Sequence, residues 1–293
     1  MKRWLKWLVL VFLATELLLA GVFCCLEERF VYYPSKLDPS LPVEEQVLMH
    51  PAAQPFFFPS EDGRQLHGNL LQSGDFIDET TLPILFCHGN GGWIGVNREW
   101  IFFEPKKPAA EGKPKVPSRY AMFFFDYRAY GYSEGDRSEL CEEKVYADAR
   151  AARKFFAELC GKSEKEVILM GHSLGGGVAV ELAQEGTPKL ILFSTFDSVP
   201  SVAQHHCPVL PMAWLTRNQF HSAAKIRTLH VPLLQFHGTY DWTVPYDHGQ
   251  RLFQNANEPK VWVELPRFGH QYGLGSFWLE ILDDFLQKDF TEN

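Results

Sequence analysis

The sequence predicts an α/β fold in which helices cover both faces of a mostly parallel central sheet. From about Gln54 onward, short apolar runs alternate with helical stretches, which is the order expected of such a fold. Most of these runs are apolar throughout, as is typical of parallel strands buried on both faces. The length of 293 residues fits one large domain. We therefore expect a single α/β domain over residues 30–293, preceded by an apolar helix within residues 1–29.

The composition limits the partners and the kinds of site. Charged residues make up 22% of the chain and apolar residues 46%, as in a globular protein rather than a disordered one. The net charge of −8 argues against nucleic acid as a partner, because phosphate-binding surfaces are usually basic. The six cysteines are scattered and show no CxxC or Cys/His finger spacing. We therefore expect neither a disulfide scaffold nor a structural zinc site.

The N-terminal segment has the length of a membrane span. Basic residues are followed by an apolar run over residues 7–26, and about 20 helical residues cross a hydrocarbon core roughly 30 Å thick. Glu16 costs about 3 kcal/mol on insertion scales, but the twelve Leu, Val and Phe residues of the run each return roughly 0.3 to 0.6 kcal/mol. We expect an uncleaved anchor. The alternative is a cleaved signal peptide, for which the run is long and the cleavage site is missing.

The charges around this run predict its orientation. Lysine and arginine precede it, whereas Glu27 and Glu28 follow it. The positive-inside rule then predicts a single-pass protein with a cytoplasmic N-terminus and its domain on the periplasmic or lumenal side. Cys24 and Cys25 are expected to be buried in lipid. The alternative is a lipid anchor at these cysteines, but Val22 and Phe23 before them are too large for a usual lipoprotein cleavage site.

The sheet is predicted to begin with an antiparallel hairpin and to continue with six strands. Residues 56–59 and 66–72 flank the turn sequence Glu-Asp-Gly-Arg, which favours a hairpin. The six apolar runs that follow are 84–87, 122–125, 167–170, 190–193, 233–236 and 261–264.

Helices are predicted over residues 138–159, 246–255 and 276–285. The first would have Ser138 as its N-cap. Its residues at core spacing are Val145, Ala149, Ala152 and Phe156. Residues 104–119 contain four prolines and are predicted to form a loop.

A glycine-flanked serine follows the predicted strand 167–170. The residues Gly171-His172-Ser173-Leu174-Gly175 have the pattern G-x-S-x-G, and the start of an apolar helix comes next. A strand that turns abruptly into a helix presents the central hydroxyl, here that of Ser173, and the glycines remove side chains that would collide. The Leu174 N–H at the helix start can then stabilise negative charge on a carbonyl oxygen. The alternative is a glycine-rich turn that holds a phosphate or only packs tightly.

A second amide donor is expected after an earlier strand. Cys87 is followed by His88-Gly89-Asn90-Gly91-Gly92, whose small residues let the backbone approach a ligand. We place the donor at the N–H of Asn90. A plain loop is the alternative.

Ser173 needs an imidazole base and a carboxylate that orients it. The expected chain order is serine, acid, histidine. Asp241 follows the strand 233–236 and His270 follows the strand 261–264, so both are expected at the carboxyl edge of the sheet, where ligand groups gather. Asp197, after the strand 190–193, is the alternative acid.

These motifs resemble those of the α/β-hydrolase family, in particular of membrane-anchored serine hydrolases of the α/β-hydrolase-domain type. The resemblance covers roughly Phe30 to the C-terminus. Residues 126–135 look like the family's stretch after its fourth strand, with Ala129 where glycine is usual. The resemblance implies an α/β-hydrolase fold and a catalytic site made of the nucleophile Ser173, the acid Asp241, the base His270, and an oxyanion hole of the Asn90 and Leu174 amides.

Residues 197–220 lie where such enzymes insert a small lid. The segment is rich in apolar side chains, which suits acyl chains. It also contains His205-His206-Cys207, but adjacent residues in a flexible loop seldom close around one ion, so we expect no metal there. Acyl transfer by a serine needs neither a metal nor another cofactor, and we expect none.

The sequence therefore predicts a membrane-tethered serine hydrolase. Its expected reaction is the cleavage of carboxylic ester or thioester bonds in acyl lipids or lipidated molecules through an acyl-enzyme. Its expected partners are the acyl substrate and, through the N-terminal helix, the membrane. Two alternatives stay open: a serine aminopeptidase-like peptidase, which needs an acidic group to hold the substrate amine, and a non-catalytic binding protein on a hydrolase fold.

Overall fold

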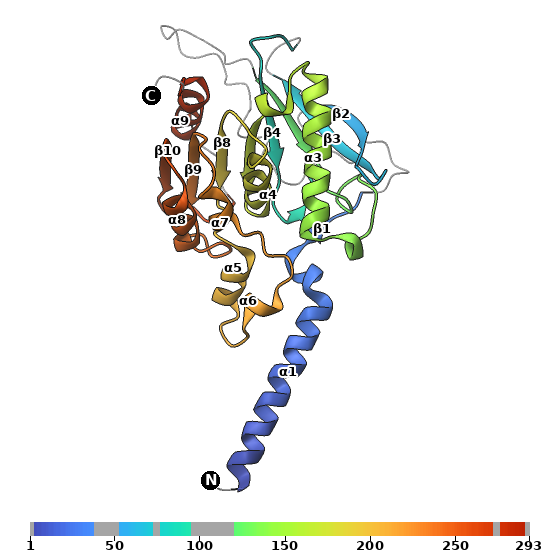
Figure 1. The fold of residues 1–293 in the computed structure, drawn as a ribbon, viewed down its shortest axis with the longest axis vertical. Helices are drawn as coiled ribbons and strands as arrows, with labels where there is room; N and C mark the ends of the chain where they lie inside the picture. The colour runs from blue at the N-terminus through green and yellow to red at the C-terminus, as the bar shows by residue number, and fades with distance from the viewer. Residues whose placement is uncertain (1–2, 38–52, 73–76, 95–119, 272–275, 291–293) are drawn as a thin grey trace.

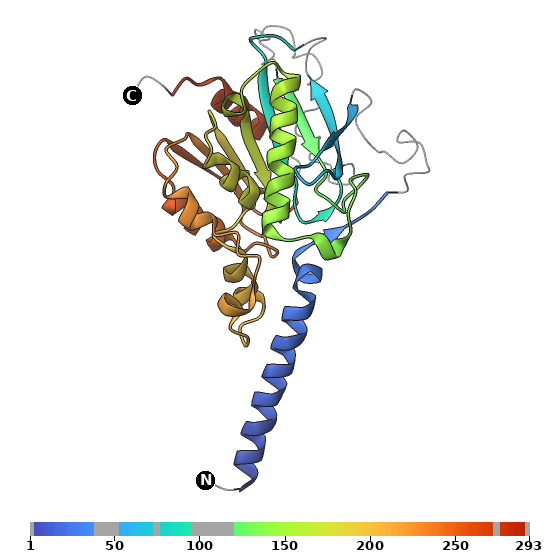
Figure 2. The same ribbon diagram turned by 45° about the vertical axis from the view of Figure 1, so that its right-hand side comes forward.

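A central sheet organises the part of the chain that the computed structural model describes, namely residues 3–37, 53–72, 77–94, 120–271 and 276–290. Its strand order is β10-β9-β8-β7-β4-β6-β3-β2 (Figures 1 and 2). β2 (Gln54–Pro59) and β3 (Gln65–Gln72) form the expected antiparallel hairpin, and β3 pairs antiparallel with β6 (Tyr120–Phe125). The remaining strands pair in parallel: β4 (Leu82–Cys87), β7 (Ile168–His172), β8 (Leu190–Phe193), β9 (Leu233–Gly238) and β10 (Lys260–Leu265). The prediction of a mostly parallel sheet is confirmed.

Helices cover both faces of this sheet and enclose two apolar cores. α3 (Glu142–Leu159), α4 (Leu174–Ala183) and α8 (Tyr246–Asn255) pack on one face, and α9 (Ser276–Gln287) packs on the other. Successive residues of β4 alternate between the cores, since Leu85 belongs to the first and Phe86 to the second. The four residues predicted at core spacing on α3 are fully buried.

The predicted N-cap at Ser138 is wrong. Ser138 lies in a short 3-10 helix, Arg137–Glu139, after which Leu140 takes extended backbone angles and α3 begins at Glu142. The Glu142 N–H donates to Asn218 Oδ1 at 2.7 Å. A residue 76 positions away therefore caps α3, and a local sequence pattern cannot indicate such a partner.

The segment expected to form a lid, residues 197–220, contains two helices. These are α5 (Val199–His206) and α6 (Met212–Leu215), and α7 (Ser222–Ile226) follows them. In Figure 1, α5 and α6 lie on the side of the sheet from which the N-terminal helix α1 (Arg3–Val31) projects.

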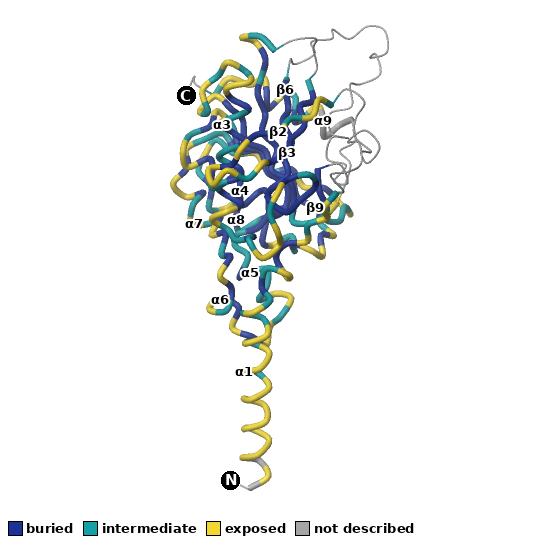
Figure 3. The backbone as a smooth tube through the Cα atoms, turned by 90° about the vertical axis from the view of Figure 1, so that its right-hand side faces the viewer, coloured by how far each residue is buried: buried dark blue, intermediate teal, exposed yellow. Residues whose placement is uncertain are grey.

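The apolar N-terminal segment forms one long helix, α1 (Arg3–Val31). Its residues Lys6–Val31 are long and apolar enough to cross a membrane, a property that a signal sequence would share. Figure 3 shows that most of the helix is exposed and that burial begins only near its C-terminal end. β1 (Tyr33–Pro34) then pairs in parallel with β5 (Gly91–Gly92). The predicted loop 104–119 lies outside the described residues.

The backbone conformation of Ala129 shows why glycine is usual at this position. Its φ is 66°, in the left-handed region that costs a residue with a Cβ roughly 1 to 2 kcal/mol. The alanine is buried against the first core, and the surrounding turn keeps this conformation despite the cost.

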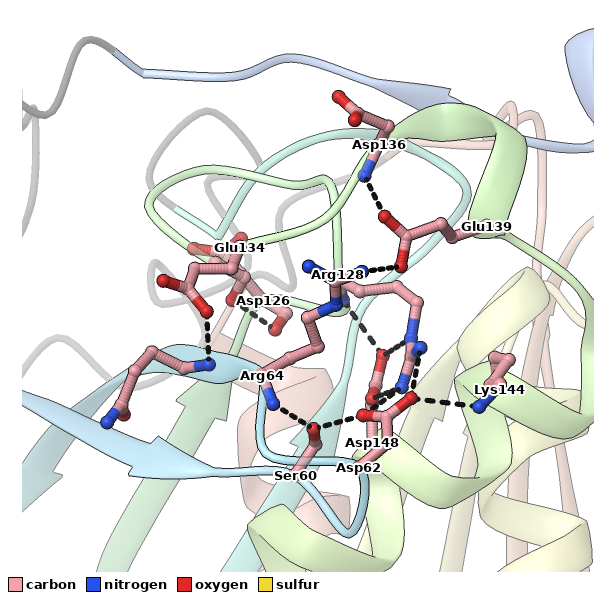
Figure 4. A network of polar contacts seen from close by, with 12 residues as sticks. Ser60, Asp62, Arg64, Asp126, Arg128, Glu134, Asp136, Glu139, Lys144 and Asp148 are labelled. Atoms are coloured by element: carbon pink, nitrogen blue, oxygen red, sulfur yellow. Dashed lines mark hydrogen bonds and ion pairs between the residues drawn. The ribbon is translucent and has the colours of Figure 1, made fainter.

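A buried ion-pair network ties the first hairpin to α3 (Figure 4). The Arg128 side chain is 1% exposed and contacts two carboxylates. It donates from Nη2 to Asp148 Oδ1 at 2.6 Å and from Nη1 to Asp62 Oδ2 at 2.9 Å. Lys144 Nζ adds a 2.8 Å bond to Asp62. The hydrogen bond from Arg128, followed by that from Lys144, holds the pKa of Asp62 well below its usual range.

Replacing Asp148 with asparagine should lower the free energy of unfolding by about 3 kcal/mol, because the buried guanidinium of Arg128 then loses its buried counter-charge and keeps only the partly exposed Asp62. Urea unfolding of the full chain in detergent, followed by circular dichroism, measures this change. Asp284 on α9 is exposed, so Asp284→Asn is the control and should stay within about 0.5 kcal/mol of wild type. An equal effect of both substitutions would contradict the role given to the network.

Candidate active site

Ser173 occupies a strained turn between β7 and α4. Its φ of 54° and ψ of −119° lie outside the regions that residues with a side chain normally adopt. Two hydrogen bonds hold it there: the Ser173 N–H donates to Phe193 O at 2.9 Å, and Thr195 Oγ1 donates to Ser173 O at 2.8 Å. The structure therefore has the abrupt strand-to-helix turn that the pentapeptide predicts.

Steric crowding explains why the two residues that flank this turn are glycines. A Cβ at Gly171 would overlap the carbonyl of Gly175, and a Cβ at Gly175 would overlap the carbonyls of Cys87 and His88. Without side chains at these positions, the end of β4 passes directly beneath the turn. The loop that follows β4 is thereby brought close to Ser173.

The structure brings together Ser173, Asp241 and His270. Asp241 follows β9 and His270 follows β10, and these two strands are parallel neighbours, so both residues emerge at the same edge of the sheet. His270 Nδ1 lies 2.8 Å from Asp241 Oδ2, and His270 Nε2 lies 3.0 Å from Ser173 Oγ. One imidazole thus bridges a carboxylate and a hydroxyl that the sequence places far apart.

The surroundings of Asp241 keep its carboxylate charged. Its Oδ1 accepts from the N–H groups of Thr243 at 3.0 Å and Val244 at 2.8 Å. Burial favours the neutral acid, but the hydrogen bond and charge of His270, together with the Val244 N–H, outweigh it and lower the pKa of Asp241. A charged Asp241 accepts a hydrogen bond from the N–H at His270 Nδ1, which leaves His270 Nε2 as the acceptor facing Ser173.

Two further histidines support this arrangement and were not predicted. His172 Nε2 lies 3.1 Å from the His270 carbonyl. His237 is fully buried, and burial lowers its pKa. Its Nε2 donates to Val244 O at 3.0 Å. Each stands at the carboxyl end of a strand, at the same edge as Ser173, and that position is the signal that could have identified them.

Asp197, the alternative acid, belongs to a different network. Its Oδ1 lies 2.8 Å from His248 Nδ1, and its Oδ2 accepts from Arg251 Nε at 2.9 Å. These bonds join the start of the segment 197–220 to α8. Burial opposes the charged form, but the hydrogen bonds and charges of His248 and Arg251 lower the pKa of Asp197 to about 2.

Replacing Asp197 with asparagine should remove about 2 kcal/mol of stability at neutral pH, since each pKa unit corresponds to about 1.4 kcal/mol. Because the folded pKa is depressed, this stability is present above about pH 4 and is lost as the pH falls toward 2. Unfolding free energies measured from pH 2 to 7 should therefore approach each other for variant and wild type at the acidic end. Asp247 pairs with the same Arg251 but its side chain is 56% exposed, so Asp247→Asn is the control and should cost less than about 0.5 kcal/mol. A constant difference across this pH range would refute the linkage.

The two expected oxyanion donors border the same cavity as Ser173. Leu174 is the first residue of α4, and N–H groups in the first turn of a helix have no acceptor within it. Asn90 is held by the chain around β1: its Nδ2 donates to Val31 O at 3.0 Å, and its carbonyl accepts from the Tyr33 N–H at 2.8 Å. The cavity that Ser173, Leu174 and Asn90 border has a volume of about 720 Å³.

The walls of this cavity are mainly apolar. They come from α1, from the segment 197–220 and from the loop after β9. Among the described residues that line it, none carries a carboxylate. Nor do any three His, Cys, Asp or Glu side chains within the described part of the chain come close enough to share a metal ion. In the His-His-Cys triplet, His206 Nε2 lies 3.0 Å from Thr243 O, so this ring nitrogen is hydrogen-bonded to the backbone.

Solved structures of similar fold include several esterases. An esterase from Pyrococcus furiosus has a TM-score of 0.61 and 17% identity, over 88% of this chain and 97% of that one. The esterase domain of a Rhodothermus marinus protein has a TM-score of 0.54 and 21% identity, over 80% of this chain and 96% of that one. At these identities the likeness establishes the fold.

Curated relatives are closer in sequence. An uncharacterized protein of Mycobacterium tuberculosis is 30% identical over 249 residues, which cover 83% of this chain and 80% of that protein. The alpha/beta hydrolase domain-containing protein aho-3 of Caenorhabditis elegans is 32% identical over 73% of this chain and 60% of its own length. The family model described as "Alpha/beta hydrolase family" matches residues 84–287. With this match, the strained serine turn and the sheet order, the chain belongs to the alpha/beta hydrolase family.

Proposed function

We propose that this hydrolase is a serine hydrolase that cleaves carboxylic ester or thioester bonds through an acyl-enzyme. The observation that carries the proposal is the single imidazole of His270, which contacts Asp241 Oδ2 at 2.8 Å and Ser173 Oγ at 3.0 Å. This is the geometry in which a base can take the proton of an attacking hydroxyl.

In the proposed reaction, Ser173 Oγ attacks the carbonyl carbon while its proton moves to His270 Nε2. The N–H groups of Leu174 and Asn90 stabilise the resulting oxyanion, and charged Asp241 stabilises the imidazolium. The C–O or C–S bond then breaks, and His270 gives the proton to the leaving alcohol or thiol. A water deprotonated by His270 attacks the acyl-enzyme, after which Ser173 Oγ leaves and regains its proton.

The apolar cavity supports an acyl substrate over a peptide. A peptidase that releases N-terminal residues must hold a protonated amine, and a carboxylate is the usual partner for that charge. The absence of a carboxylate among the described cavity residues therefore favours acyl lipids or lipidated molecules. The apolar span Lys6–Val31 supports the proposed tether, with a cytoplasmic N-terminus and the hydrolase domain on the periplasmic or lumenal side.

The proposal is tested with the purified full chain in detergent and three series of substrates: p-nitrophenyl esters, acyl thioesters and aminoacyl p-nitroanilides. We expect turnover of esters or thioesters, with a preference for longer acyl chains, and turnover of the anilides at least a hundredfold slower. Faster release of aminoacyl groups would indicate the peptidase, and no turnover of any series would indicate a binding protein.

A further inference from the structure

The last turns of α1 are built into the hydrolase domain. Glu27 is fully buried although it belongs to the apolar helix. Its Oε1 accepts from the N–H groups of Arg217 and Asn218, each at 2.8 Å, and from Asn218 Nδ2 at 3.0 Å; its Oε2 accepts from Arg217 Nε at 2.9 Å. A buried carboxylate is stable only when its hydrogen bonds are satisfied in this way. Residues 217 and 218 therefore depend on a residue of α1.

The same contacts connect α1 to the elements around the site. Asn218 Oδ1 accepts from Tyr32 Oη at 2.8 Å and from the Glu142 N–H that begins α3 at 2.7 Å. Val31, at the end of α1, accepts from Asn90 Nδ2. The helix end thus supports both the segment 197–220 and the loop that carries the expected oxyanion donor.

The cavity at Ser173 also has a wall made of α1. Leu19, Val22 and Phe23 line it together with Leu210 and Met212 of the segment 197–220. Cys24 Sγ approaches Leu215 O at 3.9 Å, and α6 lies beside α1 in Figures 1 and 2. Without residues 19–23, the cavity would lose one of its apolar sides.

This wall lies within the part of α1 that is expected to be in the membrane. With a rise of 1.5 Å per residue, Leu19 is about 10 Å along the helix from Leu26, the end of the apolar run. Two tryptophans are exposed on segments that border the cavity: Trp214, on the same helix α6 as the lining residue Met212, is 88% exposed, and Trp242, which lines the cavity, is 83% exposed. Tryptophan is enriched where membranes meet water. If α1 spans the bilayer as expected, the cavity lies beside the bilayer surface and its α1 wall extends below that surface.

We propose that α1 stays attached in the active protein as a wall of the acyl-binding cavity, and that residues 19–23 select a long acyl chain that enters from the bilayer. This inference rests on the proposed function and names its substrate as a long-chain acyl ester or thioester that is already embedded in a membrane. A glycerolipid and an S-acylated polypeptide share this chemistry. In either case the chain passes from lipid to the cavity along α1 without crossing water.

The test uses the full chain in phosphatidylcholine vesicles and two matched variants. Val22 lines the cavity and is 45% exposed, whereas Val9 is 46% exposed and lies outside the cavity. Val22→Trp should lower kcat/KM for p-nitrophenyl hexadecanoate at least tenfold and for p-nitrophenyl butanoate less than twofold. Val9→Trp should change neither by more than twofold. Equal effects of the two variants, or an equal loss for both esters, would overturn the proposal.

Two vesicle-borne probes distinguish the sources of the acyl chain. One is a phosphatidylcholine with a fluorescent hexadecanoyl chain, and the other is a transmembrane peptide with an S-hexadecanoyl cysteine. Faster turnover of the lipid identifies a glycerolipid, and faster turnover of the peptide identifies an S-acylated polypeptide. Either result supports the proposal if Val22→Trp reduces turnover and Val9→Trp does not.

Two measurements do not depend on the reaction. The intact mass of the membrane-purified protein should include residues 1–26, and a mature chain that lacks any of residues 19–23 would overturn the proposal. In a Ser173→Ala background, photoreactive hexadecanoic acid should cross-link to the buried cavity residue Phe196. Adding Val22→Trp should reduce the yield of this cross-link at least fivefold. Cross-linking in a protein that hydrolyses no ester would count against the proposed function alone, whereas absence of cross-linking at Phe196 would overturn the cavity assignment.

Discussion

Replacing Ser173 with alanine should lower kcat for an acyl ester by about 10⁴- to 10⁶-fold, the range seen when the nucleophile of such a site is removed. The variant lacks the Oγ that would form the acyl-enzyme, so a fluorophosphonate probe should no longer label the protein. Gel fluorescence with the probe and steady-state hydrolysis of a p-nitrophenyl ester measure the two effects. Because only one oxygen is removed, the thermal unfolding midpoint should stay close to that of the wild type.

Ser201 provides a demanding control for this experiment. Its Oγ lies 3.0 Å from Asp197 and 3.4 Å from His248 Nδ1, so it too stands beside a histidine and an aspartate. Both Ser201 and Asp197 face the same nitrogen of His248, however, and a proton relay needs one partner on each nitrogen. Ser201→Ala should therefore keep full probe labelling. Labelling lost in Ser201→Ala but kept in Ser173→Ala would move the nucleophile to α5.

Replacing Asp241 with asparagine should lower kcat by about 10⁴-fold, as in other sites where the orienting acid is neutralised. The neutral amide of the variant no longer stabilises the proton at His270 Nδ1, so the imidazole places its proton at Nε2 and cannot accept that of Ser173. KM should change less than about threefold, because Asp241 does not line the described cavity. Steady-state kinetics at pH 7 to 8 with the same ester separate kcat from KM.

The comparison variant is Asp197→Asn, which removes the alternative acid. It should keep kcat within about threefold of wild type, since Asp197 bonds to His248 and Arg251 rather than to His270. Loss of kcat in Asp197→Asn with activity retained in Asp241→Asn would make Asp197 the acid. If both variants kept wild-type kcat, the proposed relay through His270 would be wrong.

Local patterns sufficed to predict most of the elements. The apolar runs that became β4 and β6–β9 are recognisable because buried strands need apolar side chains on both faces. Ser173 was recognisable because a side chain at position 171 or 175 would collide with the backbone, so that both positions need glycine. The start of α3 was predicted wrongly, because its cap is Asn218 rather than a neighbour in sequence. His172 and His237 were missed because only their position at the carboxyl ends of two strands distinguishes them from the other histidines.

The sequence by itself determined the class of fold, the strand-to-helix turn at Ser173 and the presence of a long apolar helix at the N-terminus. Each follows from side-chain size or polarity within a few consecutive residues, where the backbone geometry leaves few alternatives. Only the tertiary structure decided that His270 contacts both Asp241 and Ser173, that Asp197 bonds elsewhere, and that Glu27 is buried against residues 217 and 218. These pairings depend on which strand ends and helices become neighbours, and that is decided by the packing of the whole sheet rather than by the residues beside them in sequence.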